Sequence, residues 1–154
     1  MPSYYRDPDS PAPNVPRRVG VIALLERGGA VLVQRRADDG AWDFVGGGLD
    51  EEETVLGALH REVHEETGLR IADAELFGVF SDPTRTIEYP DGNICRLLSM
   101  VFRARPAPGE PRPSEESLEL CFIGLKELAE LDVWPTARPI RDAYLAGRGD
   151  VIVD

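Results

Sequence analysis

The sequence predicts an α/β fold in which α-helices cover both faces of a mixed β-sheet. Three observations support this prediction. The chain has 154 residues, of which 42% are hydrophobic, which suits one domain with its own core. Short apolar, strand-like runs recur along the chain, and a few segments with helical spacing lie between them. No internal repeat indicates a solenoid.

The two ends of the chain differ from the part between them. Residues 1–16 contain five prolines and no apolar run, so we expect a flexible arm rather than a secretion signal. The domain is expected over residues 17–147, followed by a short tail over residues 148–154. No apolar run is long enough for a membrane span. The two cysteines, Cys95 and Cys121, form no Cys-x-x-Cys motif, which favours free thiols and a cytoplasmic location.

The first elements of the domain are expected to be strands. Val19–Leu25 and Ala30–Arg35 are apolar runs on either side of Gly28-Gly29, which predicts a β-hairpin. Trp42–Val45 is a shorter apolar piece, and the glycine triplet Gly46-Gly47-Gly48 ends it.

The clearest helix is predicted over Thr54–Thr67. Thr54 can cap its first turn, and Gly68 stands where a helix-ending glycine belongs. Apolar residues recur at steps of three and four, so one helix face should be buried. These residues are Val55, Leu56, Leu59 and Val63.

The second half of the chain predicts further strands and two helices. Thr86–Tyr89 and Ile94–Ala104 flank the turn Pro90-Asp91-Gly92-Asn93, and Ala74–Phe80 precedes them as a strand. A last strand is expected over Ser117–Ile123, and helices over Leu125–Leu131 and Thr136–Ala146.

The charge balance restricts the possible partners. Asp and Glu total 28 against 17 Lys and Arg, a formal net charge of −11. An acidic chain repels phosphate backbones, so a nucleic-acid polymer is not an expected partner. Part of this acidity is concentrated in Gly46–Leu69, where Arg61 is the one arginine or lysine.

Three glutamates of the predicted helix form a stripe. Glu62, Glu65 and Glu66 lie within about 100° of one another at 100° per residue. Like charges at these spacings repel, and a hard divalent cation such as Mg²⁺ relieves the repulsion. The preceding glycines, Gly46-Gly47-Gly48, permit positive φ and a close approach of the backbone to a ligand. A solvated helix face is the simpler alternative.

The full spacing of this segment resembles the sequence motif of the Nudix hydrolases. That motif is Gly, five residues, Glu, seven residues, Arg-Glu, an aliphatic residue, any residue, Glu-Glu, any residue, Gly and an aliphatic residue. Every fixed position is present, as Gly47, Glu53, Arg61-Glu62, Val63, Glu65-Glu66, Gly68 and Leu69. Trp42–Gly47 and Glu116–Leu128 resemble flanking segments of the family. Val45, Asp50 and Glu52 depart from its common residues outside the metal-ligand positions.

The resemblance implies a Nudix fold and the hydrolysis of a diphosphate linkage with Mg²⁺, for which Mn²⁺ can substitute. It implies that Glu62, Glu65 and Glu66 bind the metal and that Arg61 orients the site. Glu53 is expected either to bind metal or to pair with Arg61.

The general base differs within the family. Glu62 is one candidate, and a glutamate before or on the late strand is another, because Glu115, Glu116 and Glu119 stand at suitable positions. Any of these three can instead be a solvated charge. His60 and His64 are expected to be surface residues.

The substrate is expected to be a small nucleotide. Four aromatic residues can stack on a base or pack in the core, namely Trp42, Phe80, Tyr89 and Trp134. Ser81-Asp82-Pro83 resembles a proline position of ADP-ribose pyrophosphatases, which favours ADP-ribose or a nucleotide sugar. Nucleoside triphosphates are the alternative substrates, and a monomer and a homodimer both remain open.

Three other classes of protein fit the sequence less well. A non-catalytic nucleotide sensor on this fold usually carries a DNA-binding domain or a degraded motif. An isomerase on the same fold needs an activated cysteine, and the sequence around Cys95 and Cys121 gives no clear sign of one. A calcium-binding protein would need an EF-hand loop, which the chain lacks.

Overall fold

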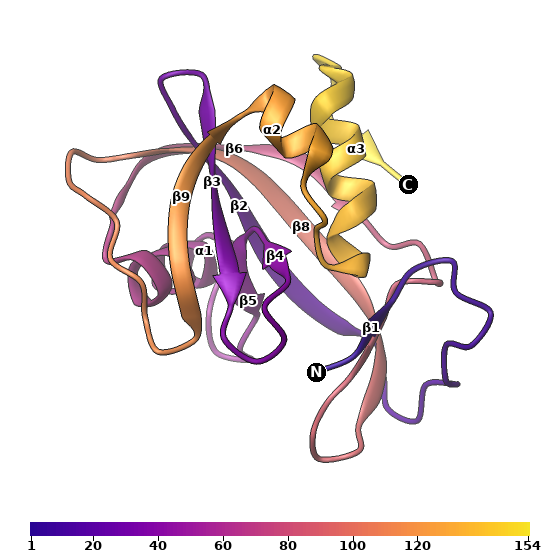
Figure 1. Cartoon of the computed structure of the whole chain (residues 1–154). Coiled ribbons are helices and arrows are strands. Elements are labelled where there is room, and N and C mark those ends of the chain that lie inside the picture. Colours follow the sequence, from indigo (N-terminus) through magenta and orange to yellow (C-terminus); the bar gives the residue numbers. More distant parts are fainter.

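The computed structural model describes residues 1–154 and places strand β2 (Arg18–Arg27) at its centre (Figure 1). β2 runs parallel to β8 (Ile94–Pro106), with Val21 beside Met100. On its other edge it pairs antiparallel with β5 (Val45–Gly48). The segment that carries the glycine triplet is therefore held against the central strand.

A second group of strands extends from the end of β2. β3 (Ala30–Arg36) forms a hairpin with β2 across Gly28 and Gly29, which both have positive φ, as the sequence predicts. β3 then pairs with β9 (Ser117–Gly124) on one edge and with β4 (Trp42–Asp43) on the other. This arrangement brings the residues before β9 to the same end as the glycine strand β5.

The remaining strands lie on the β8 side of the centre. β6 (Ile71–Phe80) pairs antiparallel with β8 and is longer than the predicted strand by three residues. β7 (Thr86–Glu88) also pairs antiparallel with β8, across the predicted turn.

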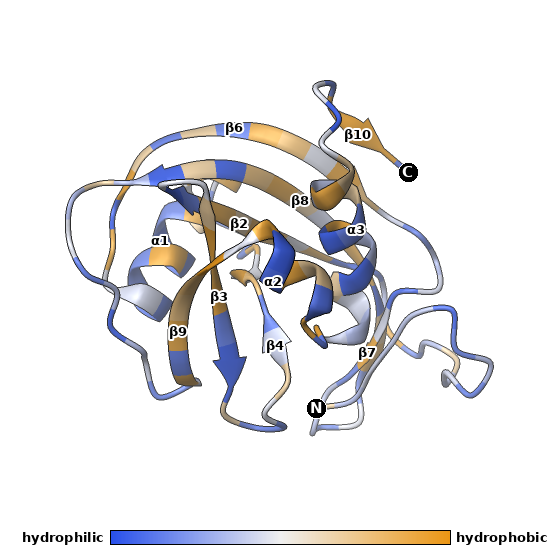
Figure 2. Cartoon of the chain, turned by 45° about the horizontal axis from the view of Figure 1, so that its top comes forward, coloured by the Kyte–Doolittle hydropathy of each residue, from blue (hydrophilic) through white to orange (hydrophobic).

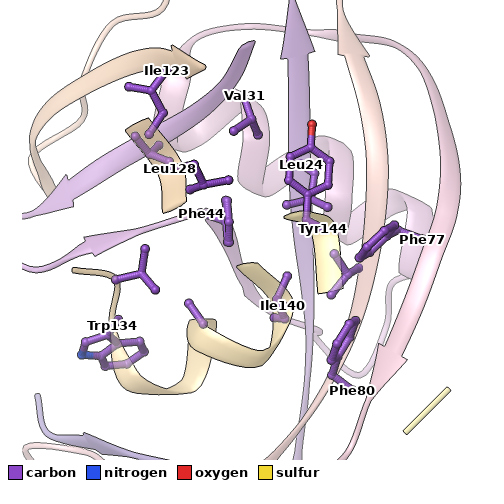
Figure 3. Packing of buried hydrophobic residues seen from close by; sticks show 14 of the residues in the cluster. Leu24, Val31, Phe44, Phe77, Phe80, Ile123, Leu128, Trp134, Ile140 and Tyr144 are labelled. Carbon is purple, nitrogen blue, oxygen red and sulfur yellow. The ribbon is translucent and has the colours of Figure 1, made fainter. Parts of the chain in front are cut away.

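Helices cover both faces of the sheet, which confirms the predicted α/β architecture. Successive side chains of β2 point to opposite faces. Val21 packs in a cluster with Leu59 of α1 (Val55–Thr67), whereas Leu24 packs in a cluster with Ile140 of α3 (Arg138–Ala146). Figure 3 shows this second cluster, in which Leu24 and Ile140 lie near the aromatic rings of β6 and α3.

Two short helices complete the second layer. α2 (Leu125–Glu130) follows β9 directly, and the 3-10 helix η1 (Pro135–Ala137) leads into α3. In Figure 2, hydrophobic residues recur along β6 and β8 between hydrophilic ones, while α2 and α3 show hydrophilic residues on their visible sides. None of these helices is long and apolar enough to cross a membrane.

Helix α1 begins and ends where the sequence predicts. The Gly57 amide donates to the Thr54 hydroxyl over 3.0 Å, and Gly68 ends the helix with φ of 73°. The prediction that Leu56 belongs to the buried face is wrong, because this residue is 51% exposed.

The two ends of the chain pack on the sheet. Ser3–Tyr4 form strand β1, which pairs antiparallel with β7, and Asn14 accepts a hydrogen bond from the amide of Ile94. Ile152–Val153 form β10, which pairs parallel with β6. The expected flexible arm is thus extended but attached, because the open edges of β7 and β6 offer unpaired backbone groups.

Candidate active site

A cleft of about 850 Å³ opens at the end of the sheet where the glycine strand β5 meets helix α1. Side chains from distant parts of the chain line it. They come from β2, β3, β5, α1, the loop before β9 and η1. All three glutamates of the predicted metal site, Glu62, Glu65 and Glu66, are among them.

The glycine triplet shapes the cleft through its lack of side chains. Gly46, Gly47 and Gly48 belong to β5, where the sequence predicts a break, and none of them adopts the positive φ that glycine permits. β-Strand pairing to β2 keeps these residues extended. The carboxyl group of Glu62 instead occupies the space that a Cβ atom of Gly47 would need. The triplet therefore lets α1 place a carboxylate directly against the strand.

Arg61 organises the acidic residues around the cleft. It donates to Glu62 over 2.7 Å, to Glu53 over 3.0 Å and to the carbonyl of Gly48 over 3.0 Å. Its hydrogen bonds lower the pKa of Glu53 to about 2, and those to both acids raise its own pKa. Of the two roles open to Glu53, the structure shows the pairing with Arg61. The longer contact to Glu65, at 3.5 Å, lies on the exposed side.

Glu66 is the buried member of the stripe. Glu66 is only 5% exposed, and its carboxyl group forms no ion pair with a cationic side chain. Its Oε2 atom accepts hydrogen bonds from Gln34 over 2.8 Å and from the Gly46 amide over 3.4 Å. Burial raises the pKa of Glu66 to about 8, against these two hydrogen bonds, which lower it. Burial also raises the pKa of Glu62.

The donor set suits a divalent cation. No three acidic or imidazole side chains already converge as a complete metal cluster. Glu66, however, is a buried acid with no cationic side chain paired to it, and the charge of Glu62 raises its pKa further. Mg²⁺ usually takes one or two carboxylates and completes its shell with water and phosphate oxygens. The arrangement of Glu62, Glu65 and Glu66 fits such a partly filled site.

The candidate bases occupy different environments. Glu115 and Glu116 line the cleft, and the charge of Glu116 contributes to the raised pKa of Glu62. Glu119 lies outside the cleft and faces Arg35 over 3.9 Å. The structure therefore separates three glutamates that the sequence left equivalent.

The two histidines of α1 are exposed, as the sequence predicts. Neither His60 nor His64 lines the cleft.

Two of the four aromatic candidates line the cleft, and each lies under an arginine; Tyr89 is half-buried, whereas Trp134 is buried and belongs to the core cluster. The guanidinium carbon of Arg18 is 4.7 Å from the ring centroid of Tyr89, and that of Arg36 is 3.9 Å from the Trp134 ring.

The other two aromatic candidates lie outside the cleft. Phe80 is buried in the core beside Phe77 (Figure 3), and Trp42 packs on the same core cluster.

The Ser81-Asp82-Pro83 segment also lies outside the cleft. Pro83 is exposed, in a turn where the Asp82 carboxylate accepts a hydrogen bond from the Thr84 amide. The segment thus has an ordinary turn geometry, and Pro83 makes no contribution to the wall of the cleft.

Sequence reasoning missed two buried polar residues of this region. Gln34 is 6% exposed and bonds to Glu66, and Arg85 is 1% exposed and donates to the carbonyl oxygens of Phe80 and Thr136. For Gln34 the sequence does hold a signal, because a glutamine at the end of an apolar strand indicates a polar side chain close to the core. For Arg85 the sequence holds no such signal, because it stands in a polar turn.

The two cysteines are free, as the sequence predicts. Burial raises the pKa of both the Cys95 and Cys121 thiols, which opposes formation of a reactive thiolate. The isomerase alternative therefore lacks its activated nucleophile.

Comparison with known proteins identifies the family. A family model for the NUDIX domain matches residues 15–144. A MutT-like protein of Streptomyces ambofaciens is 36% identical over 107 residues, which cover 70% of this chain and 63% of that protein. The chain thus spans less than two thirds of that relative. The nucleoside triphosphatase NudI of Escherichia coli O139:H28 is 30% identical over 125 residues, covering 76% of this chain and 89% of NudI.

Solved structures agree with this assignment. A NUDIX hydrolase from Nitrosomonas europaea superposes with a TM-score of 0.68 at 25% identity, covering 91% of this chain and 81% of that one. An ADP-ribose pyrophosphatase from Streptococcus suis reaches a TM-score of 0.71 at 19% identity, covering 89% and 98%, and so shares the fold. With the motif intact and three of its four glutamates on one cleft, the chain belongs to the Nudix hydrolase family.

Proposed function

We propose that this protein uses Mg²⁺ to hydrolyse the diphosphate linkage of a nucleoside diphosphate joined to a second moiety. One observation carries the proposal. Glu62 and Glu66 line a cleft large enough for a nucleotide, and Glu66 is buried there with no cationic side chain paired to it. Burial favours the protonated form of Glu66, so its ionised form needs a positive partner, and a metal bound to a diphosphate provides one.

Glu62, Glu65 and Glu66 would hold Mg²⁺, or Mn²⁺ in its place. The bound metal would neutralise the diphosphate oxygens and make a water molecule more acidic. Arg61 keeps Glu62 in position through its hydrogen bond, while its contacts with Glu53 and the Gly48 carbonyl fix the guanidinium itself. The Gly46 amide and Gln34 hold Glu66.

The reaction is a substitution at phosphorus by water. The water oxygen forms a bond to one phosphorus atom, the bridging P–O bond breaks, and the second phosphate leaves with the bridging oxygen. A carboxylate must take the proton that the water loses. We assign this role to Glu116, with Glu115 and Glu62 as alternatives, because all three line the cleft and Glu119 does not.

The two aromatic–arginine pairs favour a substrate with two groups to bind. Tyr89 with Arg18 and Trp134 with Arg36 both line the cleft. Tyr89 is the half-buried ring and can stack on a base, whereas Trp134 is buried and holds Arg36 at the cleft, and an arginine binds hydroxyl or phosphate oxygens. This favours ADP-ribose or a nucleotide sugar. Pro83, the sequence feature that also favoured this substrate class, lies outside the cleft and does not support it.

Nucleoside triphosphates are the second candidate substrates. The observation in their favour is the 30% identity to NudI, which is named a nucleoside triphosphatase. The alignment covers 89% of the length of NudI. A triphosphate would occupy the same metal-binding end of the cleft, and its base would use one of the two aromatic–arginine pairs.

A substrate panel with matched variants tests the proposal. Purified protein is incubated with ADP-ribose, nucleotide sugars, dinucleoside polyphosphates and nucleoside triphosphates, with Mg²⁺ or with chelator, and products are separated by ion-exchange chromatography. We expect Mg²⁺-dependent cleavage of one class and its loss in Glu62→Gln and Glu66→Gln. Glu119→Gln is the control, because it removes the same charge outside the cleft. Tight nucleotide binding without any cleavage would overturn the enzyme assignment and support a sensor.

A further inference from the structure

A chain of buried side chains connects the loop before β9 to the metal-binding helix. Ser117 is the first residue of β9, and its hydroxyl donates to Oε1 of Gln34 over 2.6 Å. The Gln34 amide nitrogen then donates to Oε2 of Glu66 over 2.8 Å. Three elements that are distant in sequence, β9, β3 and α1, therefore meet through one glutamine.

The orientation of the Gln34 amide is determined by its neighbours. Its nitrogen donates both to Glu66 and to the carbonyl oxygen of Phe44, the latter over 3.1 Å. Its oxygen accepts from Ser117. A flipped amide would place its oxygen against the Phe44 carbonyl oxygen, which can only accept, and against Oε2 of Glu66. Gln34 is only 6% exposed, so water has little access to replace these partners.

The same contacts determine which oxygen of Glu66 is free. Both hydrogen bonds to the carboxylate, from Gln34 and from the Gly46 amide, reach Oε2. Oε1 accepts no hydrogen bond, and Glu66 lines the cleft. A carboxylate held by one oxygen presents the other to a ligand in a fixed direction, as partners behind metal ligands usually do.

We propose that Gln34 is a positioning residue of the hydrolytic site. It holds Glu66 by Oε2 so that Oε1 is available to the divalent cation. Through Ser117 it also ties the position of Glu115 and Glu116 to that carboxylate. This inference rests on the proposed function, because it takes Glu66 to be a metal ligand.

The test measures Mn²⁺ binding in the absence of substrate, by isothermal titration calorimetry, together with kcat and KM. Gln34→Met keeps the volume of the side chain and removes its polar atoms. We expect Mn²⁺ binding and kcat to fall by about 10-fold to 100-fold, with KM little changed. Arg35→Met, the exposed neighbour on β3, is the matched control and should leave the affinity for Mn²⁺ unchanged. Wild-type affinity in Gln34→Met would overturn the proposal.

A double-mutant cycle separates positioning from general damage. In a Glu66→Gln background, Gln34→Met should cause no further loss of Mn²⁺ affinity, because the carboxylate that it positions is gone. An equal loss in both backgrounds would show general damage to the fold and would contradict the positioning role. Should Gln34→Met fail to fold, Ser117→Ala removes one bond to Gln34 alone. That variant should lower Mn²⁺ affinity several-fold, and unchanged affinity would again overturn the inference.

The controls also separate this inference from the proposed function. Wild-type Mn²⁺ affinity in Glu66→Gln would contradict the metal site itself, and with it the role of Gln34. Weak Mn²⁺ binding in Glu66→Gln, combined with wild-type Mn²⁺ affinity in Gln34→Met, would contradict only the positioning role of Gln34.

Discussion

The carboxyl group of Glu62 lies in the space beside Gly47 that a Cβ atom would fill. Gly47 is an extended residue of β5, paired with Val21 of β2, so the backbone itself would accept any residue. The glycine is therefore required by the carboxylate that packs on it. This contact links the strand to the helix at the point where we propose that catalysis occurs.

We expect Gly47→Ala to lower kcat by about 100-fold, because the new methyl group displaces Glu62 from the strand. The free energy of unfolding should change by less than about 1.5 kcal/mol, since the displaced group is the end of a flexible side chain. Steady-state kinetics and urea unfolding measure both effects. Gly48→Ala is the control, because a Cβ atom there meets no atom within 4 Å. Equal activity of the two variants would contradict the role given to the Gly47 contact.

Arg61→Lys should lower kcat by about 10-fold to 100-fold while keeping the positive charge. The guanidinium bonds Glu53, Glu62 and the Gly48 carbonyl at once, which one ammonium group cannot reproduce with the same geometry. KM should change little, because Arg61 contacts the acidic side chains. The measurement is kinetics with the best substrate of the panel. Full activity in Arg61→Lys would show that charge alone matters there.

Arg85→Met should destabilise the fold by about 2–4 kcal/mol. Arg85 is buried, and its guanidinium donates to Phe80, Thr136 and Ser99, whose oxygens would lose a partner. Burial already lowers the pKa of this arginine to about 10.

Urea unfolding of Arg85→Met should show a lower midpoint than the wild type. Arg138→Met, which removes an arginine in an exposed ion pair with Asp132, is the matched control and should cost less than about 1 kcal/mol. A midpoint unchanged by Arg85→Met would mean that the three acceptors find other donors.

The stability of the metal-free protein should depend on the protonation of Glu66. The folded-state pKa is about 8, above the ordinary value of 4.5. A raised pKa means that the folded state binds the proton more tightly. The contribution to stability is therefore complete below pH 4.5 and is lost as the pH rises through 8.

Thermal unfolding in chelator, from pH 5 to pH 9, measures this dependence. We expect the difference in Tm between Glu66→Gln and the wild type to shift in favour of the variant as the pH rises. Added Mn²⁺ should raise the Tm of the wild type at pH 8–9, since the cation replaces the proton. A pH-independent difference between the two proteins would contradict the raised pKa.

Local features were determined by the sequence alone. Thr54 and Gly68 delimit helix α1 through hydrogen bonds and φ angles within a few residues, so neighbouring residues suffice to predict them. The stripe of Glu62, Glu65 and Glu66 follows from helical geometry for the same reason. The hairpin at Gly28 and Gly29 is local as well.

Contacts between distant residues were decided by the tertiary structure. Gln34 reaches Glu66 across 32 positions of the chain and Ser117 reaches Gln34 across 83, and no local pattern reports either contact. The separation of Glu116 from Glu119 depends on where the cleft meets β9. These outcomes depend on how β3, β9 and α1 pack together, because partners and burial are properties of the packed chain. The sequence alone thus determined which residues can bind a metal, and packing decided how those residues are held.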